Sequence, residues 1–586
     1  MRADEAAETI RRMTHIQAHG GPDGEGFFTS ENHRVFFGHR RLSVIDPAQG
    51  QQPMPTQDGS AVITFNGEIY NYRELRDELQ RAGAWFQTGS DTEVILMVYK
   101  KWGEKGFEKL DGMFAFGLFD KQKNLVFLVR DMSGIKPLYW ANDKGNAFAF
   151  ASETRALAGI AVFTPENPDW KILLLAFGHI PEPVTRYKHV RMLEKGHYLQ
   201  YDLNTDQFTT TAFRQSTYLP KQHITAEEAR REIRRQVERG VTSQLVADVP
   251  LGIFLSGGID SSIVSLVAAK SHQQTRTLSV IFNESDFSER KYQQLIAGKA
   301  GSVHFEYTVT RNDLARNFTQ IVDGMDQPTT DGINTWFISR AAKENGLKVV
   351  LSGLGGDEIF GGYPSFNRIR LLQNMRMIPP PFLRAAQYLN NKTDRIGWLE
   401  NSSITGDYLF LRGYFSPVKT ASILGISVKE VFRAIERVSP PKIQQEYNLL
   451  QGGDRASFLE YHYYMQNQLL RDSDAMSMQH GIELRVPLLD QQVIQSAMVY
   501  PQEIKYGGQP KRLLIESFSD ILPESLYNRP KMGFSFPLQE WMRSLEPIAM
   551  LSSHKNPAVR RIVADFLNNK THWSKAFALY HVCQES

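Results

Sequence analysis

Cysteine is almost absent from this chain of 586 residues, since the only one is Cys583, close to the C-terminal end. That excludes a disulfide framework and a cysteine-based metal site. No apolar run approaches the roughly 18 residues that a membrane-spanning helix needs. The N-terminal segment MRADEAAETIRRM is charged and lacks the apolar core of a secretory signal. We therefore expect a cytoplasmic protein with no membrane partner.

An excess of charge of one sign is also missing. The chain has 67 Lys and Arg against 64 Asp and Glu, a net charge of +3, so nothing points to nucleic acid as a partner. A hydrophobic content of 41% and a charged content of 22% are typical of globular proteins. The length predicts two or more domains.

The first 210 or so residues contain short apolar runs that predict strands separated by turns. Two stretches with apolar residues at three- and four-residue spacing predict helices. This mixture favours antiparallel sheets with helices packed on them, an α+β architecture. The expected strands are Val35–Phe37, Ala61–Phe65, Phe114–Phe119, Leu125–Val129 and Ala147–Ala151, and the expected helices are Tyr72–Ala82 and Asp91–Trp102.

The pattern changes after a polar, irregular stretch, Thr205–His223, which we interpret as a linker. Thr225–Arg239 opens with Thr-Ala-Glu-Glu, an N-cap followed by acids, and predicts a long helix. Buried strands of a mostly parallel sheet follow at Leu251–Leu255, Leu278–Phe282 and Val349–Ser352. From about residue 365 the sequence is expected to be largely helical.

The most informative stretch is Leu255–Ser262, LSGGIDSS, which follows the apolar run Val249–Phe254. A strand runs into a Ser-Gly-Gly turn, and a helix starts at Asp-Ser-Ser. Such a turn lets backbone N–H groups at a helix start approach an anion. No Gly-Lys-Ser/Thr follows, so it is not a Walker loop.

A second glycine-rich turn, Leu351–Tyr363, reads LSGLGGDEIFGGY and follows another predicted strand. Asp357 and Glu358 beside it suit Mg²⁺, which prefers carboxylates together with phosphate oxygens. Solvated loop acids are the alternative. Ligands of open α/β sheets bind at the carboxyl ends of strands, so both turns and Asp260 are expected to meet over one nucleotide.

Polar motifs also recur between residues 19 and 153: HGGPDGEG, RLSVID, NGEIYN, SDTE, LDGMFAF, RDMSGIKPLY and ASE. Arg41 suits an α-carboxylate, because Arg binds carboxylates bidentately. Glu68 and Asp91 suit an α-ammonium, and Asn66 can donate its amide to an oxyanion. Each residue alone reads equally well as a turn or capping residue.

Together the C-terminal motifs resemble the synthetase domain of the glutamine-hydrolysing asparagine synthetase family, an ATP-pyrophosphatase. The resemblance extends through DAMSMQHGIELRVPLLD at 474–490 and RPKMGFSFP at 529–537. It implies a site for ATP and Mg²⁺, with Lys531 stabilising charge on the adenylate and pyrophosphate. The implied ATP-binding residues are Leu255, Ser256, Gly257, Gly258, Asp260, Ser261, Ile281, Ser352 and Gly353, and the implied metal ligands are Asp260 and Asp357.

The N-terminal motifs resemble the class II glutamine amidotransferase domain, a sandwich of the N-terminal-nucleophile type, in which Arg41, Asn66, Gly67, Glu68 and Asp91 would bind glutamine. The expected division is 1–210 for this domain, 211–224 for the linker and 225–586 for an α/β parallel-sheet domain with a helical C-terminal part. The family begins Met-Cys-Gly-Ile, with the cysteine as nucleophile. Here that cysteine and the first strand are missing, and a helix-like segment follows Met1. A truncated start, a degenerate scaffold and ammonia from solution or a partner are three competing explanations.

Two further departures concern the acceptor. Leu354 stands where the family usually has Glu, and Ala475 stands where Lys or Arg is common. We expect each to remove a charge near the adenylated carboxylate.

The leading interpretation is a ligase that adenylylates a carboxylate, aspartate by resemblance, and then adds nitrogen from glutamine or free ammonia. The alternatives are a ligase with another acceptor, in surface-polysaccharide or peptide tailoring, and a catalytically silent interaction subunit. The resemblance also implies a homodimer.

Overall fold

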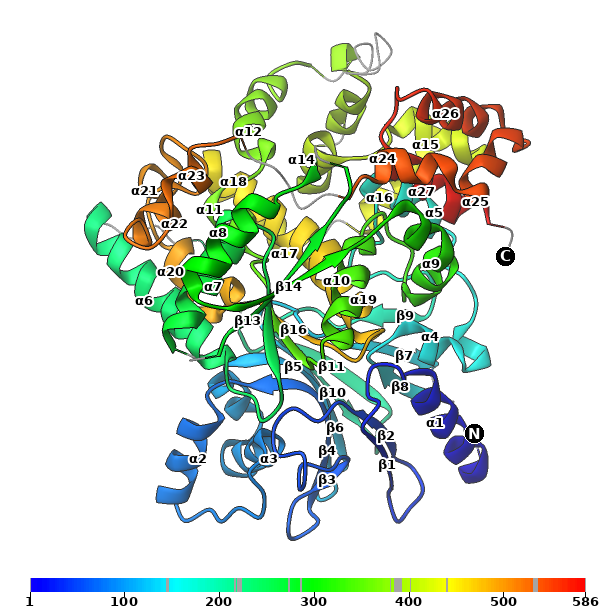
Figure 1. Cartoon of the computed structure of the whole chain (residues 1–586). Coiled ribbons are helices and arrows are strands. Elements are labelled where there is room, and N and C mark those ends of the chain that lie inside the picture. The colour runs from blue at the N-terminus through cyan, green and yellow to red at the C-terminus, as the bar shows by residue number, and fades with distance from the viewer. Residues whose placement is uncertain are drawn as a thin grey trace.

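The computed structural model describes residues 2–584, apart from 144–146, 215–217, 219–223, 272–273, 285–286, 380, 384–392, 401, 439–440 and 531–535 (Figure 1). No helix within those described ranges is long and apolar enough to cross a membrane.

A six-stranded sheet in the order β11-β10-β6-β5-β4-β3 organises the N-terminal part. All of its pairings are antiparallel. A hairpin of β1 and β2 and a three-stranded sheet β8-β7-β9 lie beside it. The strands are β1 Gly24–Thr29, β2 Phe36–Arg41, β3 Met54–Pro55, β4 Ala61–Ile69, β5 Gly112–Asp120, β6 Leu125–Arg130, β7 Tyr139–Asp143, β8 Ala147–Ala151, β9 Val190–Met192, β10 His197–Asp202 and β11 Gln207–Ala212. The helices are α1 Ala3–Ile16, α2 Tyr72–Arg81, α3 Asp91–Trp102, η1 Gly103–Lys109, α4 Thr154–Ala158, η2 Ala161–Phe163 and α5 Trp170–Phe177.

Strand β5 shows why this part is a sandwich. Phe114, Phe116 and Leu118 pack with α2 and α3, whereas Ala115 and Phe119 join a separate core with the hairpin and β7-β8. Alternate residues of a strand point to opposite faces, so both faces of the sheet are covered. Helix α1 closes the outer side by packing on the three-stranded sheet.

The second part is built on a parallel sheet in the order β14-β13-β12-β15-β16. Helix α6 precedes it, and its start carries the predicted cap, because Thr225 and Glu228 form a reciprocal capping box. The elements of the sheet layer are α6 Ala226–Gln244, β12 Leu251–Phe254, α7 Ile259–Ser271, β13 Arg276–Ile281, α8 Arg290–Ala300, β14 Val303–Thr308, α9 Arg311–Gly324, α10 Ile333–Glu344, β15 Val349–Leu351 and β16 Glu483–Arg485.

Helices make up most of the chain after β15, and the predicted fold class is confirmed. They are α11 Gly356–Phe360, α12 Pro364–Met375, η4 Asp394–Glu400, α14 Ile404–Arg412, α15 Pro417–Leu424, α16 Val428–Arg437, α17 Pro441–Leu449, α18 Gly452–Leu459, the π-helix η5 Glu460–Leu470, α19 Arg471–Met478, η6 Pro487–Leu489, α20 Gln491–Met498, α21 Gln502–Tyr506, α22 Arg512–Ser517, α23 Glu524–Tyr527, α24 Leu538–Trp541, η7 Met542–Ser544, α25 Glu546–Ala549, η8 Met550–Ser553, α26 Pro557–Leu567 and α27 Trp573–Cys583.

The prediction of an irregular linker from Thr205 is wrong for its first part, where β11 forms. All six residues of β11 are exposed, so the strand lacks the apolar alternation that sequence patterns detect. It is an edge strand that pairs with β10 through its backbone. Strand β16 likewise interrupts the stretch predicted to be helical.

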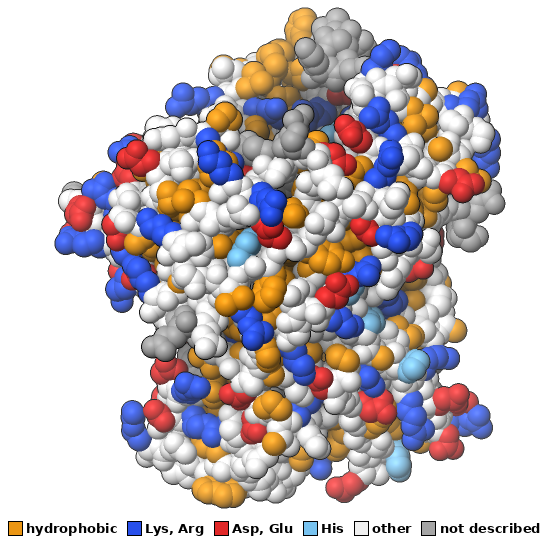
Figure 2. Space-filling view, viewed as in Figure 1, with side chains coloured by type: hydrophobic (Ala, Val, Ile, Leu, Met, Phe, Trp, Pro, Cys, Tyr) orange, Lys and Arg blue, Asp and Glu red, His pale blue; other side chains and the backbone are white. Residues whose placement is uncertain are grey.

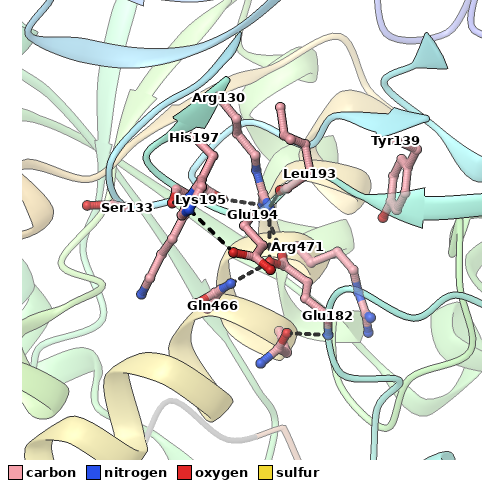
Figure 3. Close-up of polar contacts among 12 residues, drawn as sticks. Arg130, Ser133, Tyr139, Glu182, Leu193, Glu194, Lys195, His197, Gln466 and Arg471 are labelled. Carbon is pink, nitrogen blue, oxygen red and sulfur yellow. Dashed lines mark hydrogen bonds and ion pairs between the residues drawn. The ribbon is translucent and has the colours of Figure 1, made fainter. Parts of the chain in front are cut away.

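A buried polar network ties the two parts together (Figure 3). The Arg130 guanidinium on β6 donates to both carboxylate oxygens of Glu182 at 3.0 Å and to the Leu193 carbonyl at 2.7 Å. Gln466 of η5 donates to the same carboxylate, and the Glu182 N–H donates to Asn467 Oδ1 at 2.8 Å. The network fixes η5 against the N-terminal sheets, and η5 leads directly into α19.

Candidate active site

The Ser-Gly-Gly turn joins β12 to α7 as the sequence predicts. Gly257 has a φ of +82°, which favours glycine there. Ser256 Oγ accepts from the Gly258 N–H at 3.2 Å and lies 2.9 Å from Ser261 Oγ. These bonds hold the turn closed over the start of α7, where backbone N–H groups suit an anion.

The second glycine turn lies directly against the first. A Cβ at Gly353 would be 2.6 Å from the Ser261 nitrogen, and one at Gly356 would be 2.4 Å from Asp260 Cγ. Gly355, between them, has a φ of +105°. Only glycine permits this approach, so the two turns meet as the sequence predicted.

Lys511 joins the two predicted metal ligands, and the sequence analysis did not identify it. Its Nζ lies 2.5 Å from Asp260 Oδ2 and 2.7 Å from Asp357 Oδ1. The side chain is buried, and the two carboxylates raise the pKa of Lys511 despite the opposing effect of burial. The Gly507-Gly508-Gln509-Pro510 sequence before α22 is a turn signal that points to this position.

The carboxylate pair fits a magnesium ion. Asp260 and Asp357 supply hard oxygen donors that one cation, Lys511, already brings together. Mg²⁺ bound with a nucleotide takes one or two carboxylates plus phosphate oxygens. No group of three or more His, Cys, Asp or Glu that could hold a metal by itself occurs in the described part of the chain.

A cavity of about 340 Å³ opens over both turns. Its wall includes most of the predicted ATP-binding and metal residues: Leu255, Ser256, Gly258, Asp260, Ser261, Ser352, Gly353 and Asp357. Gly257 and Ile281 do not line it, whereas Ser279 and Val280, which directly precede Ile281 on β13, do. Lys531 lies outside the described residues.

The lining of the same cavity also includes Leu354 and the acids Asp331, Glu358 and Asp472. Burial raises the pKa of Asp472 to about 7. Burial and the neighbouring Asp357 raise the pKa of Glu358 to about 8, and Glu358 accepts a 2.6 Å hydrogen bond from the Tyr363 hydroxyl. The only Lys and Arg among the described lining residues are Lys511 and Arg529, and Arg529 is ion-paired with Glu289 at 2.7 Å.

A second cavity, of about 180 Å³, contains all five predicted glutamine-binding residues: Arg41, Asn66, Gly67, Glu68 and Asp91. A Cβ at Gly67 would lie 2.0 Å from the Met113 carbonyl oxygen, so the strand needs glycine there. The Arg41 guanidinium donates to the Asp46 and Pro47 carbonyls at 2.7 and 2.8 Å. No thiol occurs among the described residues that line this cavity, and Cys583 lies in α27.

Both parts of the chain contribute charges to the second cavity. Lys136 binds Asp474 at 2.9 Å, Arg485 binds Glu483 at 2.8 Å, and Arg485 Nη2 lies 3.5 Å from Glu68.

Burial is the largest influence on the pKa values of two acids that line this cavity, Glu68 and Asp91. It raises the pKa of Glu68, and the nearby Glu483 and Asp91 charges raise that pKa further. The pKa of Asp91 is raised to about 6, mainly by burial, although Asp91 accepts from the Ile69 N–H at 3.0 Å. The described lining carries charges of both signs, with acids such as Glu68 and Asp91 and the bases Arg40, Arg41, Lys136 and Arg471. Such a lining suits an amino acid, whose ammonium and carboxylate have opposite charges.

Helix α19 contributes residues to both cavities, as does β16, whose Glu483 lines the smaller one and Leu484 the larger one. Asp472 and Ser473 line the larger one, whereas Asp474, Ala475 and Met478 line the smaller one. Ala475 thus lines the smaller cavity among the described residues, and its expected place near the adenylated carboxylate stays a prediction. The residue faces the cavity of Arg41, because a step along a helix turns the side chain by about 100°.

Comparison with known proteins agrees with this pair of cavities. Residues 232–572 match the family model described as asparagine synthase, which covers more than half of the chain. This chain belongs to the asparagine synthase family. Residues 1–214 match the model of a glutamine amidotransferase domain. The resemblance predicted from the motifs is confirmed, and with it the prediction of an asparagine synthase-type carbon–nitrogen ligase.

The curated relatives described here match between 62% and 92% of this chain. The glutamine-hydrolysing asparagine synthetase 1 of Bacillus subtilis is 32% identical over 554 residues, which are 92% of this chain and 85% of the relative. Asparagine synthetase B of Escherichia coli is 33% identical over 62% of this chain and 63% of its own length. A Zea mays asparagine synthetase is 32% identical over 62% of this chain and 57% of its own length.

Proposed function

We propose that this chain uses ATP to adenylylate a carboxylate and then joins nitrogen to the activated carbon as an amide. In the first step a carboxylate oxygen attacks the α-phosphorus and pyrophosphate leaves. In the second, a nitrogen nucleophile attacks the acyl carbon, loses a proton and expels AMP. The observation that supports this most is the Lys511 ammonium between Asp260 and Asp357, beneath two touching glycine turns.

The proposed roles follow from the positions of the residues. Backbone N–H groups of Ser256–Gly258 and the start of α7 hold phosphate oxygens, and Ser352 and Gly353 contact the nucleotide. Asp260 and Asp357 are the proposed magnesium ligands, and the ion supplies positive charge to the phosphates when bound. Lys511 orients the two carboxylates. Lys531 is proposed from the sequence to stabilise the departing pyrophosphate.

Nitrogen delivery is assigned to the smaller cavity. Arg41 is proposed to hold the α-carboxylate of glutamine, and Glu68 and Asp91 its ammonium. Ammonia from glutamine or from solution would then have to pass α19 and β16, which line both cavities, to reach the larger one. The division of the chain at 1–210, 211–224 and 225–586, a homodimer and a cytoplasmic location remain predictions.

A second candidate keeps the chemistry and changes the acceptor. Leu354 and the acids Asp331 and Asp472 line the acceptor side, and both described cations of the cavity are already ion-paired. Among the described lining residues, the second carboxylate of free aspartate would meet these acids and no cation that lacks an ion pair. This favours a singly charged acid, such as a uronic acid of a surface polysaccharide, over aspartate.

Pyrophosphate release in the presence of ATP, Mg²⁺ and single carboxylic acids tests both candidates. We expect release with at least one acid, and release with a uronic acid but not aspartate would select the second. Asp260→Ala is expected to lower release at least about 100-fold. Asp77→Ala, an exposed position on α2, is the control and should leave release unchanged. If a folded protein that binds ATP releases pyrophosphate with none of the acids, the silent interaction subunit is the correct interpretation.

A further inference from the structure

An unusual share of the exposed hydrophobic surface lies on one short segment at the end of α12. Leu371, Met377, Ile378 and Phe382 are 47%, 78%, 37% and 67% exposed. The other large, exposed hydrophobic side chains of the described residues are scattered singly over the molecule, as is normal for a surface. We call these four residues the α12 patch. Figure 2 shows hydrophobic side chains gathered at the top of the molecule, the end that carries α12.

Positive charge accompanies the α12 patch. Between residues 364 and 393 the chain has five basic residues and no Asp or Glu, although its overall charge is only +3. Arg368 and Arg370 are exposed on α12. Arg376 is held by Asp407 through a 2.8 Å hydrogen bond, so it serves the fold instead. Burial lowers the pKa of Arg395, the charge of Arg368 lowers it further, and Asp394 opposes both effects.

The combination of exposed apolar side chains and flanking arginines matches one kind of partner. A bilayer with anionic lipids offers negative headgroups above an acyl layer, and interfacial helices bind it with basic and apolar residues together. An acidic protein as the partner would account for the arginines but not for the exposed apolar side chains.

The position of the α12 patch relates a membrane contact there to the larger cavity. Tyr363 lines that cavity and immediately precedes α12. The twelve residues of α12 span about 18 Å at about 1.5 Å a residue. A membrane at the far end of α12 would therefore lie within reach of the site where the carboxylate is activated.

We infer that the α12 patch docks this protein on the surface of a membrane that contains anionic lipids. The inference goes beyond the proposed ligase activity and does not depend on it. It revises the expectation of no membrane partner, which concerned spanning segments. The contact is peripheral and reversible, because four apolar side chains and two arginines insert only at the headgroup boundary.

Cosedimentation of the full chain with vesicles tests the inference. The vesicles are phosphatidylcholine alone or with about 30% phosphatidylglycerol, in about 0.1 M NaCl, where charges act over about 10 Å. We expect binding to the anionic vesicles to be at least about tenfold tighter than to neutral ones, and to weaken at about 0.5 M NaCl. Equal or absent binding to both vesicles would overturn the inference.

Two variants and two matched controls locate the contact. Met377→Asp should weaken binding about tenfold, and Arg370→Glu about 25-fold, since each charge contributes about fivefold. Met550→Asp and Arg231→Glu change the same residue types at positions that are 66% and 71% exposed elsewhere, and should bind as the wild type does.

Unchanged thermal unfolding of all four variants checks that they fold. If Met550→Asp loses as much binding as Met377→Asp, the contact is not at the α12 patch. If ultracentrifugation instead shows a dimer that Met377→Asp dissociates, with no vesicle binding, the surface joins two copies of this chain and the membrane inference is wrong.

Discussion

Replacing Lys511 by methionine removes one ammonium group and leaves the length of the side chain nearly unchanged. Asp260 and Asp357 then lie close together in a buried site without the cation that joins them. The variant therefore isolates the electrostatic contribution of Lys511 from its packing.

The size of the effect follows from the geometry. At the 2.5 and 2.7 Å contacts the attraction is about 6 kcal/mol each for an effective dielectric constant of about 20. Desolvation offsets much of this attraction, and breaking a buried pair lowers the free energy of unfolding by about 3–5 kcal/mol. For a unit of roughly 360 residues, that corresponds to a midpoint about 4–7 °C lower.

The pH dependence of this loss has a definite sign. The pKa of Lys511 is raised in the folded protein, so its stabilising effect is complete below the ordinary lysine pKa and is lost only as the pH rises through the folded value. The difference between wild type and variant should therefore be constant from about pH 6 to pH 9.

Thermal unfolding with and without Mg²⁺ separates a metal site from an ordinary ion pair. In Lys511→Met the two carboxylates lose the positive charge that Lys511 supplies, so about 5 mM Mg²⁺ should restore most of the lost stability. Lys505→Met is the matched control, because Lys505 is equally buried and pairs with the single carboxylate of Asp454 at 2.5 Å. It should lose similar stability, and Mg²⁺ should not restore it. Pyrophosphate release should fall about 100-fold in Lys511→Met and stay within about threefold of wild type, per folded molecule, in Lys505→Met.

The reasoning is refuted if Lys511→Met unfolds at the wild-type temperature, or if Mg²⁺ stabilises both lysine variants equally.

Three more expectations concern the N-terminal part. Burial raises the pKa of Asp91 to about 6, so the contribution of Asp91 to stability falls as the pH rises from about 4 to 6. Over that range the free energy of unfolding of Asp91→Asn should rise by about 2–3 kcal/mol relative to that of the wild type. A difference that stays constant with pH in urea unfolding would contradict this. Arg130→Met leaves Glu182 buried without its ion pair and should lower the free energy of unfolding by about 3–5 kcal/mol. A loss under about 1 kcal/mol in urea titrations would show that the network contributes little to stability. This chain should bind glutamine without releasing glutamate, since the described lining of the smaller cavity has no thiol. Glutamate formation in a coupled assay would reveal another nucleophile.

The sequence predicted those elements whose local signals agree with their packing. Helix α3 has the predicted bounds, because Ser90 caps it and acids fill its first turn. The glycine turns were predictable because a strand, a turn and a helix follow each other within a few residues.

Other features depend on contacts that no local pattern records. Lys511 is a single lysine in a loop, and its importance comes from carboxylates 251 and 154 residues away in sequence. Strand β16, Glu483–Arg485, is buried although two of its three residues are charged. Arg485 pairs with Glu483 within the strand and with Glu68 of the N-terminal part, and these ion pairs replace apolar packing. The cavity that Ala475 lines was not predictable either, because the sequence does not define which face of α19 meets which cavity.

Helix α19 also limits how such an enzyme can diverge. Its eight residues form a wall about 10 Å across, shared by two reaction chambers. A mutation that reshapes the acceptor side moves the backbone that carries the nitrogen side. Changes of substrate and of nitrogen supply are therefore inherited together, and a lineage that acquires a new acceptor is expected to carry altered residues in both chambers.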